Sequence, residues 1–333
     1  MNYVNEDIIS LNRVSITNML QDIGSEEVIA EIVSGLQAPE KSISSKYFYN
    51  GKGSLLFEEI TRLEEYYPAR TEKSILKKIA PGLMEQCGAY EFIELGPGDH
   101  SKISILLNAT KGMNLKSVRY LPLDISQTAI RSSAESLVNT FPHLHVEGYA
   151  LDFLSQFEPI QREPPTMICF FGSTIGNFEW AESLELLRNI SLQMKKGDVL
   201  LLGMDLIKPE AVLHGAYNDA QGITAAFNKN ILNSVNDLIN SDFQTSDFDH
   251  LAFLNKEKFR MEMYLVANRE VSVHSPHFIK DLQLKVGDSI HTENSHKYNS
   301  RHIQAIVEAT GLKLNYTHTD ERGWFALTEF QRG

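Results

Sequence analysis

Apolar runs and amphipathic stretches alternate along the middle of the chain, between about residues 70 and 206. Apolar residues that recur with the helical period predict amphipathic helices at 126–141 and 181–194. The apolar runs are "FIEL" (92–95), "RYLPLDI" (119–125), "HVEGYALDF" (145–153), "TMICFFGST" (166–174) and "DVLLLGMDL" (198–206). Continuous apolar strands separated by helices predict an α/β fold, in which a mostly parallel sheet is covered on both faces.

Two positions refine this pattern. Ser126 is expected to cap the helix that begins after it, because a serine hydroxyl can accept a hydrogen bond from a free amide of the first turn. The apolar face of that helix is formed by Ile130, Ala134, Leu137, Val138 and Phe141. Pro122 cannot donate a ladder hydrogen bond, so we expect the strand at 119–125 to bulge or to end early.

The segments before and after this region do not follow the alternation. Helices are predicted at 54–67, ended by Pro68, and at 228–243. Strand-like segments occupy 259–267 and 269–275, and residues 312–330 resemble a hairpin added to the sheet. We therefore predict two domains. The first comprises 71–206 with 298–333, and the second, of α+β type, comprises 1–70 with the insertion 207–297.

Composition and charge narrow the class of protein. The 333 residues are 42% hydrophobic and 22% charged, as is usual for a globular protein, and the net charge is −12 without a basic run. We therefore expect a small-molecule ligand and no nucleic acid. No apolar stretch approaches the length of a membrane span, and the N-terminus lacks a basic-then-apolar leader, so we expect a cytoplasmic protein without a membrane. Cys87 and Cys169 are interpreted as reduced core thiols.

The candidate chemistry begins at "ELGPGDHSK" (94–102), where a predicted strand meets a glycine-rich turn. Gly96 and Gly98 fit a nucleotide-binding turn, but Ser101 replaces the third glycine of the dinucleotide signature. Asp99 would repel a pyrophosphate at the helix N-terminus, whereas the ammonium and sulfonium of S-adenosylmethionine (SAM) would favour an acid. The turn therefore favours SAM over a nicotinamide dinucleotide.

Acids recur at the ends of three successive predicted strands: Glu94, Asp124 and Asp152. A carboxylate at the end of the second strand can accept both ribose hydroxyls, and Asp152 with Phe153 suits the amine and the face of an adenine. Each acid taken singly could equally cap the following helix. Because all three occur together, we expect them to bind the methyl donor.

Longer segments resemble the histidine-specific N-methyltransferases of ergothioneine biosynthesis, in the order in which that family has them. They are "KYFYNGKGSLLFEEITRLEEYYPAR" (46–70), "ELGPGDHSK" (94–102), "FFGSTIGN" (170–177), "GAYNDAQGITAAFNKNIL" (215–232) and "HTENSHKY" (291–298). The resemblance implies a class I methyltransferase (Rossmann-like) sheet with a second substrate-binding domain. It also implies three methyl transfers from SAM to the α-amino group of free L-histidine, giving hercynine.

The resemblance also implies site residues. The donor-binding positions would be Gly96, Lys102, Asp124, Asp152 and Phe153, to which the pattern of strand ends adds Glu94. The histidine-binding positions would be Tyr66, Asn177, Tyr217, Glu293 and Ser295, with Tyr49 and Gly172 near the amine. Tyr49 and Asn177 are the catalytic candidates. The first forty residues carry no strong correspondence.

The residues themselves leave alternatives beside these roles. The Asn177 amide can hold an amine and a carboxylate, but "IGN" can also be a simple turn. Tyr66 and Tyr67 are predicted to end a helix, one facing the core and the other a cleft. Glu293 and Ser295 would share one face of a strand and could bind both imidazole nitrogens, or they could belong to an exposed edge strand.

Other chemistry finds little support. The histidines show no metal-ligand spacing and "GSTIG" (172–176) is not a nucleophile elbow, so we expect no metal. We expect a monomeric SAM-dependent N-methyltransferase. The alternatives are methylation of another aromatic amino acid or amine, an NAD-dependent oxidoreductase, and a non-catalytic protein that binds the donor.

Overall fold

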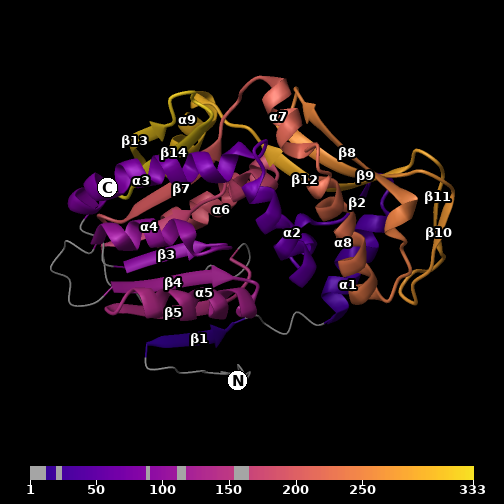
Figure 1. The fold of residues 1–333 in the computed structure, drawn as a ribbon, viewed down its shortest axis with the longest axis horizontal. Coiled ribbons are helices and arrows are strands. Elements are labelled where there is room, and N and C mark those ends of the chain that lie inside the picture. Colours follow the sequence, from indigo (N-terminus) through magenta and orange to yellow (C-terminus); the bar gives the residue numbers. More distant parts are fainter. Residues whose placement is uncertain (1–12, 20–24, 88–90, 111–117, 154–164) are drawn as a thin grey trace. The chain divides into compact units, whose positions relative to one another are not determined.

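A long mixed sheet organises the first of two compact units in the computed structural model, which describes residues 13–19, 25–87, 91–110, 118–153 and 165–333. Unit 1 consists of Met1–Gln21, Arg70–Leu206 and Tyr298–Gly333. Unit 2 consists of Asp22–Ala69 and Ile207–Lys297. Each unit is built from segments far apart in the sequence, which Figure 1 shows by its colours.

The sheet of unit 1 has eight strands in the order β1-β5-β4-β3-β6-β7-β14-β13. The strands are β1 (Val14–Asn18), β3 (Glu91–Leu95), β4 (Val118–Asp124), β5 (Leu144–Ala150), β6 (Thr166–Phe170), β7 (Val199–Asp205), β13 (Lys313–Thr319) and β14 (Phe325–Gln331). All neighbours pair in parallel except β14, which runs antiparallel to both β7 and β13. The predicted α/β sheet and the C-terminal hairpin are therefore confirmed.

Helices cover both faces of this sheet, as its continuous apolar strands require. The helices are α3 (Tyr67–Cys87), α4 (Ser101–Ala109), α5 (Gln127–Thr140), α6 (Trp180–Gln193) and α9 (Ser300–Thr310). Apolar side chains of α3, α4 and α5 pack in one core cluster, and those of α6 and α9 pack in another. Helix α5 confirms its prediction, because the Ser126 hydroxyl accepts from the Ala129 amide at 3.2 Å.

Pro122 neither introduces a bulge into its strand nor ends it early, contrary to the prediction. Strand β4 pairs with β5 in one register on both sides of the proline, with Tyr120 opposite Val146 and Leu123 opposite Tyr149. The Leu123 carbonyl accepts from the Gly96 amide beyond β3, and the Asp124 carbonyl accepts from the Leu151 amide beyond β5. Because successive residues of a parallel strand bond to alternate sides, the missing amide of Pro122 costs one bond on the β5 side only.

The N-terminal segment is the clearest difference from the predicted domains. Strand β1 pairs in parallel with β5, from Val14 opposite Val146 to Asn18 opposite Ala150. Val14 and Ile16 are buried in the core cluster that contains α5. These residues therefore belong to unit 1, whereas the sequence predicted that all of 1–70 accompanies the insertion.

The insertion leaves and re-enters unit 1 at adjacent positions. Leu206, just beyond β7, forms a parallel bridge with Tyr298. The Tyr298 amide donates to the Asp205 carbonyl at 2.8 Å. The two ends of residues 207–297 are thus held side by side at the end of β7.

Unit 2 has a four-stranded sheet in the order β2-β12-β9-β8 and a two-stranded sheet of β10 with β11. Its strands are β2 (Lys41–Ser42), β8 (Phe248–Asn255), β9 (Arg260–Ala267), β10 (Val271–Val273), β11 (Leu282–Leu284) and β12 (Ser289–His296). Its helices include α1 (Ser25–Gln37), α2 (Gly51–Arg62), α7 (Glu210–Tyr217) and α8 (Ile223–Ile239). Helix α2 packs against α8, and the rings of Phe48 and Phe227 stack with centroids 4.5 Å apart.

The helix predicted at 54–67 is instead two helices. Helix α2 ends at Arg62, and α3 begins at Tyr67 with Pro68 in its first turn. A proline is favourable there because first-turn amides have no partner within the helix. Pro68 therefore starts a helix where the sequence predicted that it ends one.

Candidate active site

The glycine turn after β3 has backbone geometry that requires glycine. Gly96 and Gly98 have φ angles of +59° and +55°, in the left-handed region that side chains disfavour. Space is not the constraint, because a Cβ on Gly98 would meet nothing within 4 Å and one on Gly96 would lie 3.9 Å from Phe153 Cε1. The glycine turn and Phe153 thus lie together at the carboxyl ends of β3 and β5.

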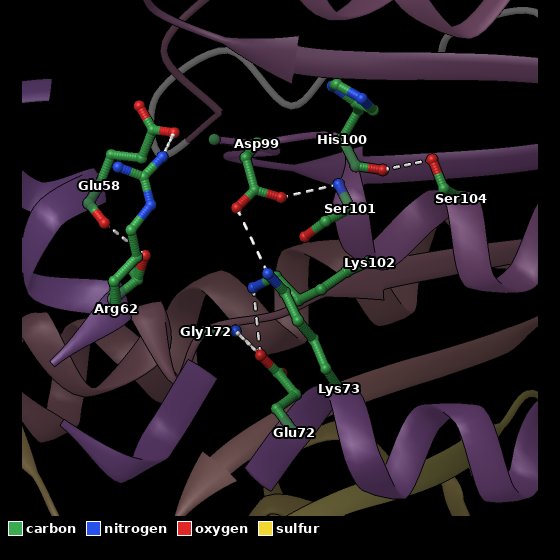
Figure 2. A network of polar contacts seen from close by, with 12 residues as sticks. Glu58, Arg62, Glu72, Lys73, Asp99, His100, Ser101, Lys102, Ser104 and Gly172 are labelled. Carbon is green, nitrogen blue, oxygen red and sulfur yellow. Dashed lines mark hydrogen bonds and ion pairs between the residues drawn. The ribbon is translucent and has the colours of Figure 1, made fainter. Parts of the chain in front are cut away.

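Asp99 is used within the turn itself. Its Oδ1 accepts from the Ser101 amide at 2.7 Å, and its Oδ2 lies 3.6 Å from Lys73 Nζ (Figure 2). Burial opposes ionisation, but the Ser101 hydrogen bonds and the lysines lower the pKa of Asp99 on balance. An amide at the start of α4 therefore already has an anionic acceptor, which disfavours a pyrophosphate there.

Lys102 belongs to a buried polar cluster that sequence reasoning did not find. Its ammonium lies 3.1 Å from Glu72 Oε2, and the fully buried Glu72 carboxylate accepts from the Gly172 amide with both oxygens at 2.9 Å (Figure 2). A Cβ on Gly203 would lie 2.2 Å from Glu72 Oε1, so glycine there leaves room for the carboxylate. Helix α3 is thereby linked to the loop after β6.

The strand-end acids do not share one environment. Asp124 ends β4, its Oδ1 accepts from the Ser126 amide at 2.9 Å, and burial raises its pKa. Asp152 and Phe153 follow β5, next to β4 in the sheet, and the Phe153 ring packs edge-on against Phe170 at 5.8 Å. Two acids and an aromatic ring beside the glycine turn fit a sulfonium nucleoside such as SAM.

Glu94 differs from the other two acids because it lies inside β3. It is 1% exposed, and its Oε2 accepts from the Tyr120 hydroxyl at 2.7 Å. Its Oε1 has no hydrogen-bond partner among the residues that the structure describes. Burial raises the pKa of Glu94 to about 8, so the carboxyl group is largely neutral at pH 7.

Asn177 lies beyond β6, at the end of a 3₁₀ turn over Thr174–Asn177. Gly172 and Ser173 lead into this turn with φ angles of +77° and +56°. The side chain of Asn177 is only partly buried. The predicted turn is present, and it leaves the amide accessible to a ligand.

In unit 2 the aromatic candidates gather around one phenylalanine. Tyr49 and Tyr66 both meet Phe57 edge-on, at 5.7 and 6.3 Å between ring centroids. Tyr49 is 40% exposed and Tyr66 is partly exposed. Tyr67 is buried, and its hydroxyl accepts from Lys208 at 2.8 Å. One of the adjacent tyrosines therefore faces the core and the other does not.

Tyr217 and Ser295, distant in sequence, are brought into direct contact. The Tyr217 hydroxyl donates to Ser295 Oγ at 2.6 Å, and Lys297 donates to both oxygens. Ser295 and Glu293 lie two residues apart on β12, opposite Met261 and Met263 of β9, in the stretch that follows a register shift. Burial raises the pKa of Glu293 to about 7, although the charge of Lys297 opposes the rise. Sequence reasoning missed Lys297, whose only signal was the alternation of 293, 295 and 297.

Other expectations concern groups outside this arrangement. The Cys169 thiol is free and buried, as predicted, whereas the side chain of Cys87 lies outside the described part of the chain. Among the described residues, no three His, Cys, Asp or Glu side chains are placed to hold a metal ion. No described helix combines the length and the apolar character needed to cross a bilayer.

Comparison with known proteins identifies the family. The profile described as "Histidine-specific methyltransferase, SAM-dependent" matches residues 28–332. A histidine N-alpha-methyltransferase of Mycolicibacterium smegmatis is 34% identical over 316 residues, which cover 95% of this chain and 98% of the relative. Ergothioneine biosynthesis protein 1 of Schizosaccharomyces pombe is 30% identical over 311 residues, covering 89% of this chain and 40% of that protein.

Solved structures with a similar fold include a SAM-dependent methyltransferase from Clostridium acetobutylicum. It is 11% identical to this chain, with a TM-score of 0.48, and the match covers 85% of this chain and 98% of that one. The fold assignment does not depend on this likeness, because strand order and pairing establish it directly. The length and identity of the sequence matches establish the family as well. This chain belongs to the histidine-specific, SAM-dependent methyltransferases.

Proposed function

We propose that this protein transfers three methyl groups in succession from SAM to the α-amino group of free L-histidine, giving hercynine. Family membership supports the reaction class. The observation that most supports histidine is the polar arrangement in unit 2, where Tyr217 contacts Ser295 on β12, two residues from Glu293 on the same strand. A carboxyl and a hydroxyl on one strand face can serve both nitrogens of an imidazole.

Unit 1 would hold the donor. Asp124 would accept the ribose hydroxyls, Asp152 and Phe153 would receive the adenine, and Gly96 would let the backbone approach. When bound, SAM supplies a methyl carbon activated by its sulfonium, which bonds to the amine nitrogen as the carbon–sulfur bond breaks. Lys102 of α4 would contact the donor as well, and Glu72 of α3 holds its ammonium in place.

The resemblance to the family supplies the histidine contacts of this proposal. Glu293 and Ser295 would hold the imidazole, and Tyr66, Asn177 and Gly172 would orient the amino acid backbone. Aligning a neutral amine is the main task, because good orientation can supply several kcal/mol. Tyr49 would accept a proton and face the growing positive charge, where cation–π attraction is worth about 0.5–2 kcal/mol.

The test is to incubate the protein with SAM and a panel of free amino acids and amines, followed by mass spectrometry. We expect up to three methyl increments on histidine alone. Methylation of tryptophan, tyrosine or another amine instead of histidine would show that the proposed substrate is wrong. Binding of SAM without methylation of any candidate would indicate a non-catalytic protein that senses the donor. Binding of NAD in place of SAM would contradict the proposed methyl donor.

Two further properties belong to the same proposal. We infer that the protein acts as a monomer, because each unit contains its own buried core. The many acids and the absence of a basic run suit a free small-molecule substrate, and we propose a cytoplasmic location. Light scattering of the purified protein at assay concentration should give one chain per particle, and a dimeric mass would contradict this inference.

A further inference from the structure

Lys297 is a buried cation within the group of residues proposed to bind the imidazole. It is 1% exposed and directly follows β12. Its Nζ donates to Ser295 Oγ at 2.7 Å and to the Tyr217 hydroxyl at 3.0 Å, and it lies 5.0 Å from the centre of the Tyr217 ring. Burying an ammonium is costly, so a position with two oxygen partners implies a purpose beyond packing.

The hydrogen bonds from Lys297 and Tyr217 decide where Ser295 can donate its own proton. An ammonium has only donors, whereas a hydroxyl has one proton and two acceptor positions. The Tyr217 hydroxyl accepts a hydrogen bond from Lys297 and donates one to Ser295 Oγ at 2.6 Å. A phenol is more acidic than an aliphatic alcohol, which favours this direction of donation. Ser295 Oγ therefore receives two hydrogen bonds, and its own proton is left to donate elsewhere.

We propose that Lys297 makes Ser295 an obligatory hydrogen-bond donor toward the substrate, and that the site thereby selects the neutral imidazole of histidine in a single tautomer. The ring nitrogen with the lone pair faces Ser295, and the nitrogen that carries hydrogen donates to Glu293. Lys297 is in this sense a positioning residue, since it acts on the substrate through Ser295. This inference rests on the proposed function.

Electrostatics at the same site support the assignment. An imidazolium has N–H groups on both sides, so one of them would meet the Ser295 proton with the Lys297 charge behind it. The opposite side offers Glu293, whose carboxyl gains ionised character from the attraction of Lys297 even though burial raises its pKa to about 7. The nearby charges Arg260 and Glu262 are both buried and paired at 2.8 Å, so they largely offset each other.

The direct test uses the unaltered protein and histidine labelled with ¹⁵N in the ring. At about pH 5.5, roughly one unit below the pKa of about 6.5 of a free imidazole, free histidine is largely protonated, and the nitrogen NMR of the bound amino acid reports its state. We expect one pyridine-type and one pyrrole-type signal. Two imidazolium-type signals, or shifts averaged between tautomers, would overturn the inference. If histidine is methylated yet binds as imidazolium, the proposed function stands and this inference fails.

Variants connect the selection to Lys297. Lys297→Met should raise the KM for histidine about tenfold or more, the usual effect of a lost polar partner, with a smaller change in kcat, and should abolish the single-tautomer signature. Lys208→Met is the matched control, because Lys208 is also a buried lysine that donates to a tyrosine hydroxyl. It should keep the signature. If Lys297→Met does not fold, Ser295→Ala must lose the signature. Retention of the signature in Lys297→Met or Ser295→Ala would contradict the role.

Discussion

The two units use buried charge in opposite ways. In unit 1, the carboxylate of Glu72 is satisfied by a backbone amide and by Lys102, so its charge fixes the course of the chain after β6. In unit 2, the ammonium of Lys297 is satisfied by two hydroxyls, so its charge orients side chains. Glu72 thus restrains backbone, whereas Lys297 restrains the hydroxyl groups of two side chains.

Two acids extend the comparison. Glu94 of unit 1 lies inside the core beside the Tyr120 hydroxyl, and burial raises its pKa to about 8. Glu293 of unit 2 is partly accessible, and the charge of Lys297 limits the rise of its pKa to about 7. Burial dominates at both acids although a lysine opposes it at each, Lys102 at Glu94 and Lys297 at Glu293, and the rise in pKa is larger for Glu94.

The largest effect should come from removing the charge that holds the frame of unit 1. Glu72→Ala leaves Lys102 and the Gly172 amide without their buried partner, and breaking such a pair typically costs about 3–5 kcal/mol. Urea unfolding measures this loss. The control is Glu58→Ala, which breaks an exposed pair with Arg62 and should cost less than about 1 kcal/mol. A loss as small for Glu72→Ala as for the control would remove the contrast between the units.

A pH-dependent effect of a few kcal/mol should follow from Glu94. Between its ordinary pKa of 4.5 and the folded value of about 8, the native protein binds a proton that the unfolded chain has released. The free energy of unfolding therefore falls as pH rises through this window and levels off above it. Glu94→Gln, which cannot titrate, should flatten that fall. The free energy of unfolding of both proteins is measured at about pH 5 and about pH 9. An equal decrease between these pH values in the native protein and in Glu94→Gln would refute the neutral state of Glu94.

An intermediate effect is expected where unit 2 would meet its substrate. Glu293→Ala should weaken histidine binding by about 1–3 kcal/mol, because the imidazole loses a buried polar partner, while SAM affinity stays the same. Steady-state kinetics with varied histidine give the change in KM. Glu270→Ala, at an exposed acid of the same unit, is the control and should leave KM unaltered. Unchanged histidine kinetics in Glu293→Ala would remove the assignment.

The smallest effect should come from the charge in the glycine turn. Asp99→Ala removes the acceptor of the Ser101 amide and should cost about 1 kcal/mol of stability, like the loss of other caps at helix starts. Asp99→Asn keeps an acceptor oxygen and should recover most of that. Thermal unfolding compares the two variants. A large loss of SAM affinity with unchanged stability would instead assign Asp99 to the donor.

Local patterns explain why most of the sheet was predictable. The strands and α5 follow from hydrophobic periodicity and a capping serine, which are read within a few neighbouring residues. Strand β1 was missed because its parallel partner β5 is distant in sequence, and five residues alone carry little pattern. Pro68 was misread because a proline marks either the end of one helix or the first turn of the next.

The candidate site divides in the same way. The glycine turn and the acids near strand ends were visible because each is a short motif beside an apolar run. Glu72 and Lys297 were not, since their partners lie 100 residues away at Gly172 and 80 residues away at Tyr217. Charged residues in such positions resemble ordinary surface residues until the fold supplies the contact.

The bridge between Leu206 and Tyr298 has an evolutionary consequence. Because the 207–297 excursion starts and finishes at neighbouring points, its length and content can change without altering the order of any strand in the eight-stranded sheet. A lineage can therefore exchange or extend residues 207–297 and keep the eight-stranded sheet unchanged. Sequence divergence in this fold is expected to concentrate in that segment.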